Sequence, residues 1–181
     1  MPIVDLTPAD SHWINAIADI LVGAFADFAP SYLATREDAL EEIAESFGTQ
    51  RLSRVLLTPD GQVAGWVAGV RAYGRLWELH PLVVAPEHRG QGYGRLLVND
   101  LARQASSRGA LTLQVSTSDE TGRTNLFGLD LFRDPLLKLG ALETTRDHPA
   151  DFYLRVGFSL VGVMPDAEGP GCPSIYFAMR V

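Results

Sequence analysis

The sequence predicts a single α+β domain over residues 1–181. Seven short segments with strand-like apolar patterns are interspersed with amphipathic segments of helical spacing. A glycine-rich turn, Arg89 to Gly94, joins an apolar run to an amphipathic run and reads as the turn between a strand and a helix. With 46% hydrophobic residues, a chain of this length can bury one core of ordinary size.

The N-terminal part begins with a strand at residues 2–6. Thr7, Pro8 and Asp10 then mark a helix start, because they offer a cap, a first-position proline and an acid in the first turn. This helix is expected to run to about Phe28. A second begins at residues 35–38 and ends near Gly48. Two strands follow, residues 51–58 and 62–72, around the turn signal Pro59-Asp60-Gly61.

The remaining elements alternate in the same way. Residues 75–85 form an apolar strand expected at the centre of the sheet, and a helix follows over residues 92–107. An alternating pattern predicts a strand at residues 110–116. A short helix is expected at 149–156, and the last strands at 158–164 and 174–179.

Composition excludes several classes of function. The formal charge of −7 argues against nucleic acid as a partner. Cys172 is the single cysteine, which excludes an internal disulfide, and the four histidines show no metal-binding spacing, so we expect no metal. We find no signal peptide and no apolar run near the ~20 residues that span a bilayer, and therefore expect a cytoplasmic protein without a membrane partner.

The glycine-rich turn has the properties of an anion-binding loop. Glycines allow positive φ and a close approach of the backbone to a ligand. The start of the following helix supplies N–H groups and the positive end of the helix dipole. The segment runs Arg89, Gly90, Gln91, Gly92, Tyr93, Gly94, Arg95. From these residues alone, an ordinary strand-to-helix connection is the alternative.

The pattern Arg89-x-x-Gly92-x-Gly94 resembles the acetyl-coenzyme A (acetyl-CoA) loop of the GNAT acetyltransferase superfamily. Residues 82–89 resemble the strand leading into that loop, and residues 152–158 resemble a later helix-to-strand motif. The resemblance implies a mixed, mainly antiparallel sheet of six to seven strands flanked by helices and splayed at the central strand. It also implies acetyl-CoA as cosubstrate, with Leu82, Val83 and Val84 offering backbone groups to it.

A closer resemblance, over roughly residues 77–178, is to the aminoglycoside 6′-N-acetyltransferases. It is carried by residues 77–84, by residues 117–124, and by segments near residues 148–153 and 161–169. It implies a small cationic amine as substrate. Ser118 and Ser174 stand where that group usually has acids, so a polyamine, an amino sugar or an amino-acid derivative stays open.

The resemblance suggests roles for individual residues. Glu78 is the candidate base that takes a proton from the amine, and His80 should project to the same side of its strand. Tyr153 is the candidate acid for the departing thiolate. The alternatives are a salt-bridged strand carboxylate for Glu78, a structural histidine for His80, and a packed tyrosine for Tyr153. Pro81 should break the strand ladder, because it cannot donate a hydrogen bond.

Substrate binding is assigned to Trp77, Asp119 and Glu120, with the two acids pairing with ammonium groups. A solvated loop is the alternative for the acids. An insertion at about residues 117–147 is expected to act as a substrate cap, with a surface insertion of no functional role as the alternative. Cys172 lacks a neighbouring base, so direct transfer in a ternary complex is favoured over an acyl-cysteine.

Two other functions stay open: acetylation of a protein or peptide amine, and a non-catalytic acetyl-CoA-binding module. An open cleft would favour the first of these, and coenzyme binding without turnover the second. The sequence also leaves a homodimer open.

Overall fold

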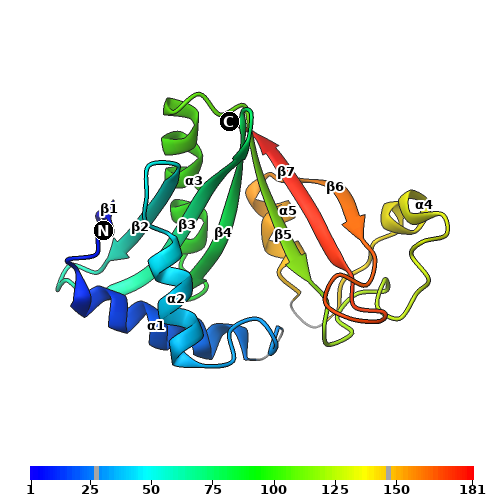
Figure 1. Ribbon diagram of the computed structural model, residues 1–181, viewed down its shortest axis with the longest axis horizontal. Coiled ribbons are helices and arrows are strands. Elements are labelled where there is room, and N and C mark those ends of the chain that lie inside the picture. The colour runs from blue at the N-terminus through cyan, green and yellow to red at the C-terminus, as the bar shows by residue number, and fades with distance from the viewer. Residues whose placement is uncertain (27–28, 146–147) are drawn as a thin grey trace. The chain divides into compact units, whose positions relative to one another are not determined.

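The computed structural model describes residues 1–26, 29–145 and 148–181. The described chain forms two compact units (Figure 1). The first contains residues 1–26, 31–113 and 180–181, and the second contains residues 29–30 and the segments from 114 to 179. Each unit is considered by itself below.

The first unit holds four antiparallel strands that pair in sequence order. They are β1 (Ile3–Asp5), β2 (Arg51–Leu57), β3 (Val63–Tyr73) and β4 (Leu76–Val84). Its helices are α1 (Ser11–Phe25), α2 (Arg36–Glu45) and α3 (Tyr93–Ser107), with a short 3-10 turn at Pro86–His88. These elements agree with the predicted ones to within a few residues, and only the 3-10 turn was not expected.

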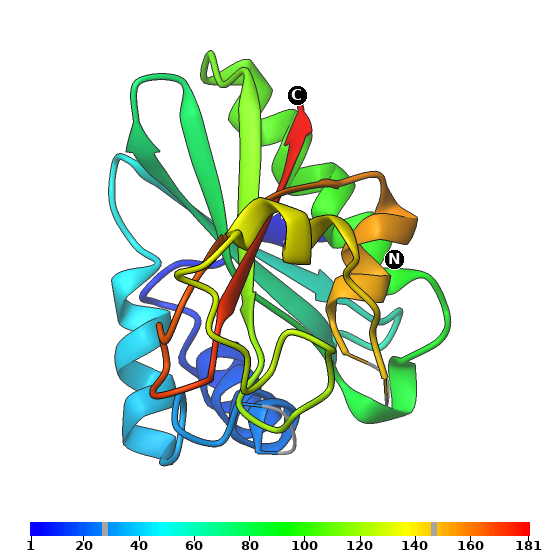
Figure 2. The ribbon, with the colours of Figure 1, turned by 90° about the vertical axis from the view of Figure 1, so that its right-hand side faces the viewer.

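The second unit contains most of β5 (Thr112–Ser118) and the antiparallel pair β6 (Ser159–Met164) and β7 (Ser174–Arg180). Its helices are α4 (Pro135–Gly140) and α5 (Ala150–Val156), drawn in yellow and orange in Figure 2. The hydrogen-bonded strand order of the chain is β1-β2-β3-β4-β5-β7-β6. The predicted α+β class, with a seven-stranded and mainly antiparallel sheet flanked by helices, is confirmed.

The helix starts differ in how they are capped. The α2 helix has the expected cap, in which Thr35 and Asp38 exchange side chain-to-backbone hydrogen bonds. Thr7 does not cap α1: its N–H and hydroxyl both donate to Asp10 Oδ2, at 2.8 and 2.7 Å, and this closes a turn before the helix begins at Ser11. The predicted end of this helix, near Phe28, lies outside the described residues.

Residues alternate along β3 between two faces of the sheet, and different helices cover these faces. Trp66 belongs to the core formed with α1 and α2, while the opposite face meets α3 (Figure 1). Two glycines on that face allow a close approach. A Cβ at Gly65 would lie 2.7 Å from Val83 O of β4 and 3.0 Å from Leu97 Cδ1 of α3, and one at Gly69 would lie 2.8 Å from Leu101 Cδ1 of α3. Leucine side chains of α3 therefore pack directly against the backbone of β3 at both glycines.

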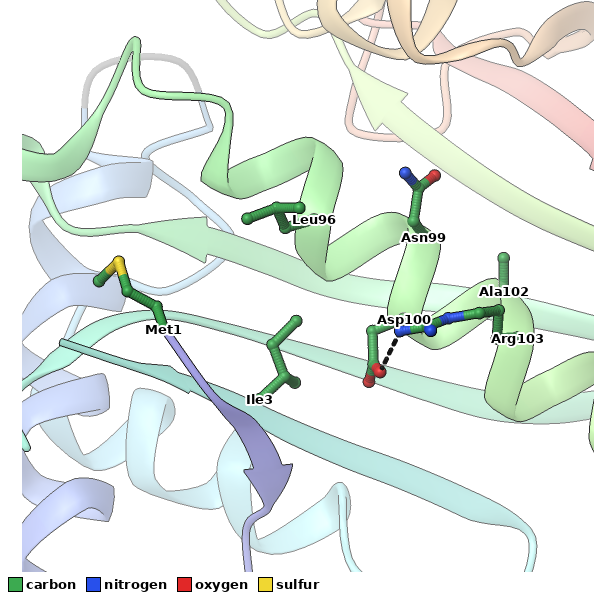
Figure 3. A pocket seen from close by; sticks show the side chains of 7 residues that line it. All are labelled: Met1, Ile3, Leu96, Asn99, Asp100, Ala102 and Arg103. Atoms are coloured by element: carbon green, nitrogen blue, oxygen red, sulfur yellow. Dashed lines mark hydrogen bonds and ion pairs between the residues drawn. The ribbon is translucent and has the colours of Figure 1, made fainter. Parts of the chain in front are cut away.

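A buried ion pair adds a polar tie between β2 and α3. Arg54 Nε lies 2.7 Å from Asp100 Oδ2, with side chains only 9% and 6% exposed. Arg54 also pairs with Asp5, and Arg103 with Asp100 at 3.0 Å. Figure 3 shows the Asp100–Arg103 pair at an open hollow of about 720 Å³. Residues of β1 and α3, with Met1, line that hollow; none of them is a candidate site residue.

Candidate functional site

The glycine-rich loop begins after β4 and ends at the first turn of α3. Gly90 and Gly92 have φ of +74° and +82°, which favours glycine at both positions. Gly92 is the residue that caps α3. A Cβ built at Gly90 or Gly92 meets no heavy atom of the described chain within 4 Å. The backbone is therefore open on that side to a ligand.

Side chains of the loop hold its shape. Arg89 Nε donates to Val84 O at 3.2 Å, and Gln91 Nε2 donates to Glu87 O at 3.1 Å. The first helical bond of α3 runs from Leu96 N to Gly92 O, so the N–H groups of Tyr93 and Gly94 precede the helical ladder. An open glycine backbone beside early helix amides fits the pyrophosphate of a nucleotide.

The predicted break in the β4 ladder is confirmed at Pro81. Leu79 stands opposite Gly69 and Leu82 opposite Val67, so His80 and Pro81 share one residue of β3, Ala68. Beyond the break, Leu82, Val83 and Val84 return to regular pairing with β3. Whether these three residues also offer backbone groups to a ligand stays a prediction.

Glu78 and His80 lie on the less buried face of β4, as the alternation predicts. Glu78 is partly exposed and His80 is exposed, whereas Trp77 and Leu79 are buried. Both polar residues interact with Tyr32. His80 Nε2 lies 2.8 Å from the Tyr32 hydroxyl, and the negative charge of Glu78 contributes to the raised pKa of the Tyr32 phenol. Within the described part of the chain, Glu78 forms no ion pair. The salt-bridge alternative for Glu78 therefore has no support.

Tyr32 and Glu42 were not anticipated from the sequence. Tyr32 precedes α2, and Glu42 lies on α2 with its Oε1 3.6 Å from His80 Nε2. They stand 48 and 38 positions from His80 in the chain. No short motif links such distant residues, and only the packing of α1 and α2 on the sheet brings them together.

Trp77 is buried, with 2% of its surface exposed. The guanidinium of Arg108 lies over its ring, 5.7 Å from the centroid. This contact lies within the first unit. The predicted contact between Trp77 and the substrate therefore has no support from the structure.

Tyr153 lies on α5 in an aromatic cluster. Its ring centroid is 5.5 Å from that of Phe158 and 6.2 Å from that of Phe177, and the residue is buried. Burial raises the pKa of the Tyr153 phenol above its ordinary value. The phenol therefore keeps its proton at neutral pH, as a general acid must. A tyrosine with a purely structural role would keep its proton for the same reason, so the alternative stays open.

Asp119 organises the start of the insertion. Its Oδ1 accepts from Arg123 N–H at 2.8 Å, and its Oδ2 accepts from the N–H and hydroxyl of Thr124 at 2.8 and 2.7 Å. The residue is 1% exposed. The Asp119 carboxylate therefore stabilises its own loop, a role that the sequence did not predict. Glu120, beside it, is partly exposed.

The insertion is further tied at both ends. A bridge joins Thr124 to Thr144. The buried His148 is within 3.1 Å of Ser118 O through Nε2, while its Nδ1 accepts from Ala150 N–H at 3.2 Å. Because Nδ1 is an acceptor, Nε2 carries the proton and donates to Ser118. Burial lowers the pKa of His148, which favours this neutral form.

Cys172 shows no feature of a nucleophile. Partial burial raises the pKa of its thiol, and the carboxylates of Glu120 and Asp119 act in the same direction. A raised pKa leaves less thiolate at neutral pH. This agrees with the expectation of direct transfer without an acyl-cysteine.

The candidate residues fall into two groups. Glu78, His80 and the glycine-rich loop belong to the first unit, and Tyr153, Asp119 and Glu120 belong to the second. Within the described ranges, no group of acidic, histidine or cysteine side chains could hold a metal ion. The described helices also include none with the length and hydropathy to cross a membrane.

A mainly antiparallel sheet with an open glycine-rich loop between β4 and α3 is the arrangement expected of an acyltransferase, and comparison with known proteins gives the family. The profile of the acetyltransferase (GNAT) family matches residues 14–128. The chain belongs to this family. No curated protein sequence matches the chain.

Solved structures give closer likenesses. One is an aminoglycoside 6′-N-acetyltransferase complexed with coenzyme A, at 29% identity and a TM-score of 0.89, covering 99% of this chain and 97% of the other. Another is the aminoglycoside 6′-N-acetyltransferase from Enterococcus faecium, at 29% identity and a TM-score of 0.86 with the same coverage. The ribosomal-protein-S18-alanine N-acetyltransferase from Escherichia coli shares only the fold, at 17% identity, a TM-score of 0.63, and coverage of 99% and 93%.

Proposed function

We propose that the protein transfers the acetyl group of acetyl-CoA to a primary amine of a small cationic molecule of the aminoglycoside type. The observation that carries the proposal is the open loop of Gly90 and Gly92 on the same unit as Glu78, at a break in β4. Among the described residues, the Glu78 carboxylate has no ion-pair partner. The likeness over 99% of the chain to two aminoglycoside 6′-N-acetyltransferases supports the substrate class.

The loop would bind the pyrophosphate of the cosubstrate. The amides of Gly92, Tyr93 and Gly94 offer hydrogen bonds, and Arg89 and Arg95 add positive charge. Leu82, Val83 and Val84 would offer backbone groups to the pantetheine arm, which a splay beside Pro81 would admit. When bound, the cosubstrate supplies an activated acetyl thioester.

The acceptor nitrogen attacks as the neutral amine, and Glu78 would accept the proton that this nitrogen loses on becoming an amide, directly or through water. The new C–N bond then forms as the C–S bond breaks. Tyr153 would return a proton to the departing thiolate; burial keeps its phenol protonated, but by raising the pKa it also makes the phenol a weaker acid. Glu120 would pair with a second ammonium group of the substrate.

A cytoplasmic location stays a prediction.

The function is tested by the release of free coenzyme A thiol from acetyl-CoA. The acceptors are an aminoglycoside with a 6′-amine, its 6′-hydroxyl counterpart, a polyamine, a monoamine and a peptide with a free N-terminus. We expect turnover with the 6′-amine and little with its hydroxyl counterpart. Preference for the peptide would favour a protein acetyltransferase, and coenzyme binding without turnover would favour a non-catalytic module.

The role of Glu78 is tested by Glu78→Gln. We expect kcat to fall by roughly 10²–10⁴-fold, with little change in affinity for the coenzyme, because only proton transfer is lost. Steady-state kinetics from pH 6 to 9 and calorimetry with coenzyme A measure the two effects. Glu41→Gln removes the same charge from the exposed side of α2 and should leave both unchanged. A wild-type rate for Glu78→Gln would remove this residue from the mechanism.

A further inference from the structure

Tyr32 makes a specific contact with His80 on β4. Its hydroxyl lies 2.8 Å from His80 Nε2, and the two ring centroids are 5.4 Å apart. The tyrosine ring also packs edge to face against Phe25, with centroids 5.0 Å apart. Tyr32 is thus held by α1 and directed at a candidate catalytic residue.

Glu42 completes a row of three groups. Its Oε1 is 3.6 Å from His80 Nε2, and its negative charge acts on the Tyr32 phenol. The Glu42 side chain is 16% exposed and the His80 side chain 46%, so the row leads from the interior to the surface. Burial and the nearby Glu42 raise the pKa of the Tyr32 phenol, which therefore stays protonated.

The proton of the His80 ring can be assigned from the groups that face Nε2. A carboxylate can only accept, so the Glu42 oxygen 3.6 Å from Nε2 favours a proton on that nitrogen. The Tyr32 hydroxyl oxygen, 2.8 Å from Nε2, can accept this proton. His80 Nε2 therefore carries a proton, and in the neutral ring Nδ1 is the acceptor.

We propose that Tyr32 and Glu42 are positioning residues that hold His80 with its proton on Nε2, so that Nδ1 is presented as a hydrogen-bond acceptor. For catalysis this inference rests on the proposed function: the Nδ1 lone pair would accept a hydrogen bond from the acceptor amine and help to aim it. The loop before α2 and the helix itself would then act in the reaction through His80, although their own side chains do not touch the reacting atoms.

The first experiment observes His80 directly and does not depend on activity. In protein with ¹⁵N-labelled histidine rings at pH 8, nitrogen shifts report which ring nitrogen is protonated. The H80Q variant assigns the signals. We expect His80 in the wild type to be protonated at Nε2, with a detectable Nε2–H proton because its hydrogen bond slows exchange with water.

The variant Y32F keeps the ring and its packing but removes the hydroxyl. We expect the Nε2–H signal to be lost and both ring nitrogens to share the proton. Y73F, which alters a tyrosine that is 73% exposed in the same unit, should change nothing. If Y32F fails to fold, E42Q replaces it, because it removes the charge and keeps an acceptor; we expect a weaker Nε2–H signal. A wild-type His80 protonated at Nδ1, or a signal unaffected by these variants, would overturn the inference.

The second experiment asks whether Tyr32 acts through His80. We expect Y32F to lower kcat by about 10–100-fold with a smaller change in KM, as a misplaced group does. In the H80Q background, adding Y32F should have no further effect. An equal fall in both backgrounds would assign Tyr32 a role independent of His80. If the wild type acetylates no amine, the proposed function fails, while the NMR result still decides the state of His80.

Discussion

At the scale of single residues, Gly92 meets two requirements that only glycine meets together: a positive φ and a backbone that a ligand can approach. Its φ of +82° is a conformation that L side chains rarely adopt, and the space beside its Cα is open. The first requirement concerns folding and the second concerns a ligand. A substitution at Gly92 therefore needs a control that separates the two.

Gly92→Val should weaken binding of coenzyme A sharply, because a branched side chain would occupy the space beside the loop backbone. Gly109→Val is the matched control: Gly109 follows the other end of α3, has φ of +85° and also faces open space. Both variants carry similar backbone strain, so both should lose stability. Calorimetry should show lost affinity only for Gly92→Val. Equal affinities in the two variants would refute the assignment of the loop.

Residue-level prediction from the sequence succeeded where a local pattern sufficed. The alternation of β4 correctly predicted that Glu78 and His80 share a side, and Pro81 correctly predicted the ladder break. The burial of Asp119 was not foreseen, because a carboxylate that bonds backbone four and five positions ahead looks like any loop acid. The Tyr32–His80 contact also has no local signature.

At the scale of elements, α3 is fixed against the sheet by the two glycines of β3 and by the ion pair between Arg54 and Asp100. The glycines permit close packing, and the ion pair fixes one rotation of the helix by directing Asp100 at β2. Removal of one partner from such a pair leaves an uncompensated buried charge, which is costly.

Asp100→Asn should lower the free energy of unfolding by about 3–5 kcal/mol, because it removes the buried carboxylate that faces Arg54 and leaves only the exposed Asp5 as partner. Asp5→Asn removes the other partner of the same arginine, but the Asp5 side chain is 75% exposed, and the expected loss is about 0–1 kcal/mol. Urea denaturation at pH 7 measures both. Equal losses would mean that burial does not determine the strength of these pairs.

Sequence patterns predicted most elements because helices such as α2 carry both a cap and an apolar stripe. The α4 helix was missed for a physical reason: its six residues are too few to show helical periodicity, and Leu136 and Leu137 are exposed. The start of α1 was placed too early, because Thr7 binds Asp10 before the helix rather than capping it.

At the scale of the whole molecule, the acidic balance suits a polycationic substrate. A formal charge of −7 attracts cations at long range, but specificity requires a carboxylate at the binding position. Asp119 has both oxygens engaged within its loop. Glu120 is therefore the better candidate of the pair for an ammonium group.

Glu120→Gln should raise KM for polyamine-type substrates far more than for a monoamine, with a smaller effect on kcat. The difference should shrink with added salt, because screening lengths fall below about 8 Å above physiological ionic strength. Asp119→Asn is the comparison, and should instead reduce stability and affect all amines alike. An unchanged ranking of amines at low salt for Glu120→Gln would contradict its assignment.

The family and fold could be predicted from the sequence because the glycine-rich loop and the strand before it are contiguous motifs. The substrate could be narrowed only to a class, since substrate contacts come from residues scattered along the chain. The sequence predicted one domain with an insertion, and the structure divides into two compact units. The single domain stays a prediction.

The close seating of α3 on Gly65 and Gly69 has a practical thermodynamic consequence. The helix that begins at the glycine-rich loop cannot detach without opening the core of its unit, so a ligand held by the loop must favour the folded state of that whole unit. At a ligand concentration 100 times Kd, linkage adds about 2.7 kcal/mol of stability. A shift in melting temperature would thus report coenzyme binding before any acceptor amine is known, and a second shift on adding an amine would identify the acceptor without any chemical turnover.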